Sequence, residues 1–271
     1  MEIDEFLTRI SLSGAEPTIF TLYEKGKNIT ATGKEVHYDN RTLKTYTKSE
    51  GTTIIGTINY DKPFPKQIFA MEPEGLKFIL QESDNVVIDD TYLVASGNMD
   101  IRWKLEVLGK GKTMEFAYKM KDIPISKDIV AKIIRADRVI NADVVSISSD
   151  GKKLGIELLN NMKGYKAYIK MDEKTDVFDA MYGKQFIECI KLVGDKDAII
   201  NIDGKKEGMP ESMRGLGKIE ISDDTAKITY YIAEITRSVN EERKAAQIKK
   251  PSENEPEENG DLNLEDGSDG N

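Results

Sequence analysis

The chain has 271 residues and a formal net charge of −9, and 39% of its residues are hydrophobic. This length and apolar content suit one large domain or two of moderate size. No apolar run reaches the roughly 20 residues that span a bilayer, and the acidic, amphipathic N-terminus is unlike a secretory signal. The single cysteine, Cys189, excludes an intrachain disulfide and a cysteine-rich zinc site. We therefore expect a protein of a reducing compartment, the cytoplasm or the nucleoplasm, that holds no metal.

The negative charge is concentrated at the C-terminal end. Residues 251–271 hold eight acidic residues and no basic one, so subtracting them from −9 leaves −1 for residues 1–250. The same segment lacks aromatic residues and is rich in Asn, Gly and Pro, a composition that cannot bury enough surface to order itself. We predict a charged, largely disordered tail over 237–271 and a nearly neutral folded body, on which a basic patch can form.

Four short stretches have the apolar spacing of amphipathic helices, and β-type runs separate them. The order is helix, strands, helix, strands, and it then occurs a second time. Ser126 is the predicted N-cap of the third helix, and Gly194 is the predicted C-cap of the fourth. The helices are predicted at 2–11, 73–83, from 127 onward and at 182–194, and the strands at 18–23, 28–33, 41–47, 52–60, 85–90, 92–97, 99–107, 143–149, 153–160, 165–171, 197–203, 217–222 and 226–235.

The repeated order predicts a pseudo-duplicated α+β architecture with antiparallel sheets and two helices per half. We expect a first domain at 1–107, a connector at 108–123 and a second domain at 124–236. A single irregular β-rich domain is the alternative.

No pattern of catalytic residues stands out. His37 is the only histidine and lies in a polar β-type run, where a surface position explains it. The "GKGK" at 109–112 lacks the spacing and the Ser/Thr of a phosphate-binding P-loop. Cys189 fits a small buried side chain. We therefore predict that the chain is not an enzyme and uses no cofactor.

Basic residues lie opposite the apolar stripes of the predicted helices. On the third helix, Lys132, Arg135 and Arg138 fall within about 120° of one another. The apolar residues Ile129, Val130, Ile133 and Ile134 lie on the opposite side. Such a basic face neutralises phosphates without identifying bases. For any one helix, the alternative is that its basic residues face solvent and bind nothing. The predicted contacts with duplex DNA are Arg9, Lys77, Lys127, Lys132, Arg135, Arg138, Lys184 and Lys191.

Three segments resemble the DNA polymerase sliding clamps, which include the proliferating cell nuclear antigen type and the clamps of tailed phages. "EGLKFILQESDNVVIDD…MDIRW" is similar to the helix-strand unit of the first clamp domain, and "FAYKMKDIPISKDIVAKIIRADRVINADVVSIS" to the unit that leads into the second. "KITYYIAEI" at 227–235 resembles the closing strand that borders the partner-binding pocket, except that Glu234 stands where the family has proline. The resemblance covers about residues 1–236.

The resemblance implies a sliding-clamp fold with helices lining a ring and sheets outside. It implies a processivity factor, commonly a homotrimer, that encircles duplex DNA, tethers a replicative DNA polymerase and is opened by an ATP-dependent clamp loader. Partner peptides are then expected at Met114, Phe116, Tyr231 and Ala233. Such a protein would work in the cytoplasm at the nucleoid, or in the host cytoplasm for a phage or viral clamp.

Two other functions stay open at this point. One is a monomeric DNA-binding polymerase accessory subunit with the same fold. The other is a structural β-rich protein, such as a virion component, whose helices face solvent.

Overall fold

The computed structural model describes residues 1–30, 33–83, 85–97, 99–108, 121–171, 177–202 and 215–235. Within these ranges each half holds two helices, and neighbouring strands pair antiparallel. The predicted α+β class and the duplicated order of elements are confirmed. No described helix is long and apolar enough to cross a membrane.

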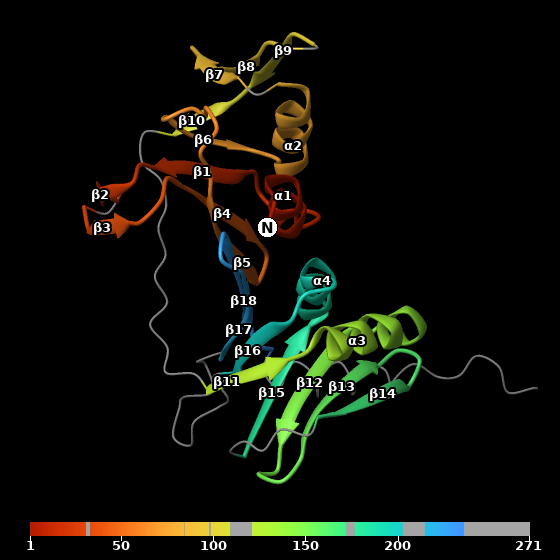
Figure 1. The fold of residues 1–271 in the computed structure, drawn as a ribbon. Helices are drawn as coiled ribbons and strands as arrows, with labels where there is room; N and C mark the ends of the chain where they lie inside the picture. The colour runs from red at the N-terminus through yellow and green to blue at the C-terminus, as the bar shows by residue number, and fades with distance from the viewer. Residues whose placement is uncertain are drawn as a thin grey trace, which may run out of the picture.

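One nine-stranded sheet extends through both halves (Figure 1), in the order β10-β6-β1-β4-β5-β18-β17-β16-β11. The halves meet where β5 pairs with β18, from Ala226 opposite Ile58 to Ile232 opposite Thr52. A continuous ladder of hydrogen bonds therefore joins β5 of the first half to β18 of the second half. The strands are β1 (Thr18–Tyr23), β4 (Thr42–Ser49), β5 (Thr52–Asn59), β6 (Ile68–Met71), β10 (Glu106–Leu108), β11 (Lys121–Ile125), β16 (Ala198–Ile202), β17 (Leu216–Ser222) and β18 (Ala226–Ala233).

Each half adds a smaller sheet. The first half has the three-stranded sheet β7-β8-β9 and a separate β2-β3 hairpin, and the second half has the four-stranded sheet β14-β13-β12-β15. In these sheets β7, β9, β14 and β15 are edge strands. The bounds are β2 (Gly26–Ile29), β3 (Glu35–Tyr38), β7 (Val86–Asp89), β8 (Tyr92–Ala95), β9 (Ile101–Lys104), β12 (Val144–Ser149), β13 (Leu154–Asn160), β14 (Tyr165–Met171) and β15 (Phe178–Gly183).

The single strand predicted over 99–107 is wrong. The structure divides this run into β9, which pairs with β8, and β10, which pairs with β6 in the large sheet. Leu105 lies between them, is buried, and donates its backbone N–H to the Thr91 carbonyl at 2.8 Å. The apolar alternation continues across the junction, so the sequence pattern does not show that the chain changes sheets.

The four helices form one row over the same side of the large sheet, in the order α2-α1-α4-α3 (Figure 1). The central pair, α1 and α4, packs on β5 and β18 where the halves meet. Phe6 of α1 fills the space above Gly56, where a Cβ would lie only 2.6 Å from its ring. Tyr230 of β18 is fully buried and donates its hydroxyl to the Arg9 carbonyl at 3.0 Å. The bounds are α1 (Ile3–Ile10), α2 (Pro73–Glu82), α3 (Lys127–Ile140) and α4 (Lys184–Val193), which confirms the four predicted helices.

The predicted connector at 108–123 overlaps strands at both of its ends, because β10 extends through Leu108 and β11 begins at Lys121. The rest of the connector, 109–120, lies outside the described residues, as does the predicted tail at 237–271.

Candidate nucleic-acid interface

Helix α3 presents the most strongly basic surface of the helix row. The Ser126 side chain accepts the Ile129 N–H at 3.4 Å, which confirms the predicted N-cap, and the helix ends at Asn141 with φ of 50°. Val130 and Ile133 are buried against the second-half sheets. The opposite face is exposed and carries Lys127, Lys132, Arg135 and Arg138.

These four cations are open to an incoming anion. Within the described ranges, no ion pair joins any of them to an acidic side chain. Arg135 makes only a long bond from its Nε to the Ala131 carbonyl, at 3.4 Å. The exposed Lys184 at the start of α4 is similarly unpaired among the described residues. Exposed cations of this kind neutralise phosphates at little desolvation cost.

Lys191 of α4 is held in place by acidic neighbours. Its Nζ lies 3.1 Å from Asp137 Oδ2 and 3.3 Å from Glu188 Oε1. Partial burial acts to lower the pKa of Lys191, but the hydrogen bond and charge of Asp137 outweigh it and raise that pKa. Asp137 is itself buried and accepts the Ala142 N–H at 2.9 Å. Sequence patterning missed this acid, which lies between Val130 and Ile133 on the apolar stripe of α3 and not among the basic residues.

A cavity of about 590 Å³ opens between α3 and α4 beside this pair. Ile134, Asp137, Arg138, Asn141 and Lys191 line it. The predicted residues Arg138 and Lys191 are thus brought to one place, with amide and carboxylate groups between them.

The prediction for Arg9 is wrong. Its side chain is nearly buried, and its guanidinium donates to Glu5, to Asp195 and to the Leu192 and Val193 carbonyls at the end of α4. The carboxylates of Glu5 and Asp195 each lie 2.8 Å from Nη2. Arg9 therefore joins α1 to the C-terminus of α4 and has no donor left for DNA.

The helices of the first half carry little free positive charge. Lys77 is half-buried and donates to the Thr8 hydroxyl at 2.8 Å. Gln81 donates to Asp4 at 2.7 Å, and Phe78 is exposed beside them. The basic surface of the helix row consequently lies in the second half.

Comparisons with known proteins rest on structure alone, since no family model and no curated protein matches the chain. PCNA of A. fulgidus, bound to the C-terminal region of FEN-1, is 17% identical, with 87% of this chain and 96% of that chain covered and a TM-score of 0.54. The proliferating cell nuclear antigen of Entamoeba histolytica is 13% identical, with 86% and 96% covered and a TM-score of 0.56. The H. pylori beta clamp is 14% identical, with 86% of this chain but 64% of that chain covered and a TM-score of 0.58. The chain has the sliding-clamp fold.

In this clamp fold, Tyr231 and Ala233 lie on the face of β18 away from the helices. Successive side chains of a strand alternate, and the preceding Tyr230 points toward α1. Both residues are half-buried, and burial raises the pKa of Tyr231. Glu234, where the clamp family has proline, is buried, and its Oε1 accepts the Met181 N–H at 3.4 Å. Met114 and Phe116 lie outside the described residues.

His37 and Cys189, the two residues considered for catalysis in the sequence, lie in different halves of the structure. His37 is exposed on β3, with its Nε2 3.7 Å from Asp39. Cys189 is fully buried in α4, and burial raises the pKa of its thiol. Within the described part of the chain, no group of three His, Cys, Asp or Glu residues could hold a metal ion.

Proposed function

We propose that the chain is one subunit of a DNA sliding clamp that encircles duplex DNA and tethers a replicative polymerase without catalysing a reaction. The basic face of α3, on the helix row of a sliding-clamp fold, is the observation that carries this proposal. Its Lys and Arg side chains suit phosphates, which are the same for every DNA sequence, and it presents no pair of Asn or Gln side chains for adenine. Contacts of this kind let a protein slide.

A ring requires that two different edges of the subunit meet head to tail. The edge strands β9 and β14 fit this requirement, because each ends a sheet on a different half of the subunit. Ile101 and Trp103 of β9 face the helix side, and Trp103 packs over Gly75 of α2. Tyr165 and Ala167 of β14 face the helix side of their own sheet, with Tyr165 exposed. Pairing of β9 with β14 of the next subunit would cover these apolar groups. Three subunits are proposed from the resemblance to proliferating cell nuclear antigen.

The partners are proposed on the same basis. The A. fulgidus neighbour is bound to the C-terminal region of FEN-1. For this chain we expect polymerase and ATP-dependent loader segments on the face of β18 that carries Tyr231 and Ala233. The site of action would be the cytoplasm, where a nucleoid or phage DNA is replicated.

Topology gives a direct test. The full chain, loaded on nicked circular duplex by its clamp loader, should stay bound through a high-salt wash and leave when the circle is cut. Its mass in solution should be about three times the 30.4 kDa of one chain. Salt-sensitive binding that is equal on circular and linear DNA, with a monomeric mass, would support the monomeric accessory subunit. Absence of DNA association under both conditions would support the structural protein.

A further inference from the structure

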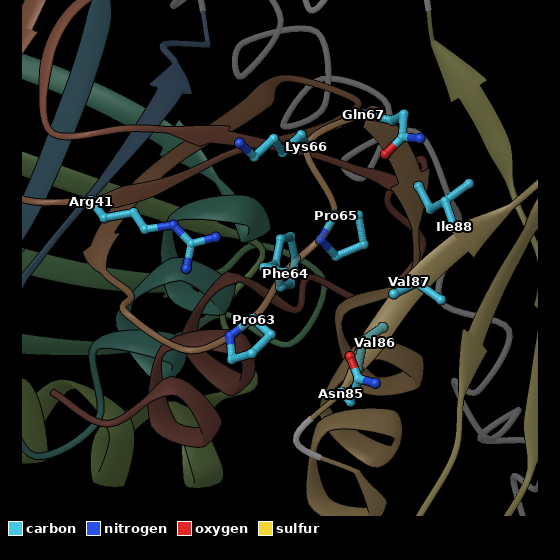
Figure 2. A pocket seen from close by; sticks show the side chains of 10 residues that line it. All are labelled: Arg41, Pro63, Phe64, Pro65, Lys66, Gln67, Asn85, Val86, Val87 and Ile88. Carbon is cyan, nitrogen blue, oxygen red and sulfur yellow. The ribbon is translucent and has the colours of Figure 1, made fainter.

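A groove of about 600 Å³ lies in the first half, between the segment that links β5 to β6 and the strand β7 (Figure 2). Phe64 and its flanking prolines form one wall, and Val86, Val87 and Ile88 form the other. Arg41 and Lys66 lie at the side of the Phe64 segment. Its lining therefore combines apolar side chains with two basic ones, and includes no acidic one.

The β7 wall is a hydrogen-bonding edge of the sheet. Successive side chains of a strand point to opposite faces, so a wall made of three consecutive residues presents the strand edgewise. The sheet order agrees, because β7 pairs only with β8 among the described strands. Alternate N–H and C=O groups of β7 thus point into the groove, where an extended peptide can pair with them.

The basic side chains define the charge of such a peptide. Glu24 lies 3.5 Å from Arg41 Nε and 3.6 Å from Lys66 Nζ. These distances exceed the roughly 2.7–2.9 Å of a charge-assisted hydrogen bond, so a closer carboxylate can compete with Glu24. Lys66 is the more exposed of the two cations, since Arg41 Nη1 also donates to the Lys62 carbonyl. The groove therefore fits an extended segment with apolar side chains two residues apart and acidic residues beside them.

The chain itself contains one such segment, "DLNLED" at residues 261–266. We infer that it binds along β7 as an added strand, with Leu262 and Leu264 in the groove and its acids near Arg41 and Lys66. Leu262 and Leu264 are two positions apart, the spacing that places side chains on one face of a strand. The 25 residues from 236 to 260 that separate β18 from this segment span at most about 85 Å when fully extended.

Disulfide trapping in the full chain tests this contact. Asn263→Cys is combined with Val87→Cys in the groove, or with Val139→Cys on α3 as the matched control. The native Cys189 does not compete, because it is fully buried with a raised thiol pKa. Val139 is 78% exposed and Val87 is 49% exposed. Disulfides formed by random collision should therefore form faster in the Val139 control pair than in the Val87 pair.

We expect the Val87 pair to form its disulfide at least tenfold faster than the Val139 pair, with either an intrachain or an intersubunit product. Adding Leu262→Ser and Leu264→Ser should lower the rate to that of the control. In the wild type, amide protons on the free edge of β7 should exchange at least tenfold more slowly than in the double Leu→Ser variant. Equal trapping rates at positions 87 and 139 would overturn the inference and leave the groove to a peptide of another protein. None of these readouts involves DNA, so their outcome is independent of the proposed clamp function.

Discussion

Arg9 and Arg138 show how differently one residue type is used on this helix row. Each lies in the last turn of its helix, Arg9 in α1 and Arg138 in α3. Arg9 is nevertheless nearly buried, whereas Arg138 is exposed. The difference arises from the end of α4, whose last carbonyls have no intrahelical donor. Arg9 supplies that donor to Leu192 and Val193. Arg9 therefore has a structural role, whereas the exposed side chain of Arg138 is accessible to a ligand.

Replacing Arg9 with Met should destabilise the fold by about 2–3 kcal/mol, since charged hydrogen bonds to buried carbonyls are lost. Chemical denaturation at neutral pH measures this change. Lys77→Met, which removes one bond to Thr8 on the same row, is the matched control and should change stability by less than about 1 kcal/mol. If the Arg9→Met protein keeps wild-type stability but binds DNA more weakly, Arg9 contacts DNA and its assignment here is wrong.

The same contact predicts a pH dependence. Burial acts to raise the pKa of Glu5, but its bonds to Arg9 and Lys196 lower it overall, and the Arg9 hydrogen bond lowers the pKa of Asp195. Folded-state pKa values below the unfolded ones give stability that is present above about pH 4.5 and is lost as the pH falls. The stability gap between the wild type and Arg9→Met should therefore narrow between pH 5 and pH 3. A gap that widens in acid would contradict this assignment.

Arg135 and Arg138 carry the proposed DNA contact. Their replacement by Ala should weaken retention on duplex equally for all sequences and lower the salt slope by about 0.9 for each lost phosphate contact. Stability should change by less than about 0.5 kcal/mol, because both are exposed. Lys152→Ala with Lys153→Ala removes the same charge from the exposed turn between β12 and β13 and should leave the slope unchanged. If the two double variants show the same dependence of log affinity on log salt concentration, α3 does not contact DNA.

At the scale of elements, local patterns predicted most of the fold. The helix positions followed from apolar spacing, and Ser126 and Gly194 marked their ends as the structure has them. What sequence could not show depends on contacts far apart in the chain. Arg9 meets Val193 across 184 positions, and the division of 99–107 between two sheets depends on β6 and β8 as partners. The groove beside β7 was likewise missed, since Phe64 and Val87 come from separate segments.

The packing of α1 on β5 gives a prediction at this scale. A Cβ at Gly56 would lie 2.6 Å from the Phe6 ring and from Thr45 Oγ1, both in the buried core. Gly56→Ala should therefore destabilise the fold by about 1–3 kcal/mol through overpacking. Thermal denaturation checks this, with Thr57→Ala on the opposite face of β5 as the control. Adding Phe6→Leu to Gly56→Ala should recover part of the loss, and a neutral Gly56→Ala would show that α1 is loosely packed.

At the scale of the whole molecule, basic side chains should favour DNA binding at the helix face but oppose association of subunits at the β9 and β14 edges. Arg102 and Lys104 lie on the face of β9 away from α2, and Lys166 and Lys170 lie on the face of β14 away from α3. If these strands pair between subunits, like charges meet across the new ladder, which costs roughly 0.2–1 kcal/mol per pair. Salt screens this repulsion.

The ring should therefore dissociate less as salt rises from 50 to 300 mM, while its basic helix face releases DNA more easily. Lys166→Glu with Lys170→Glu should strengthen subunit association at low salt and remove its rise with salt. Sedimentation at micromolar concentration measures both effects. The charge-matched control is Lys152→Glu with Lys153→Glu, in the turn between β12 and β13 and outside both edge strands. If the β14 variant associates less well than the control, these edges do not meet. If both variants shift association equally, the effect is one of net charge, and the subunit contact lies elsewhere on the molecule.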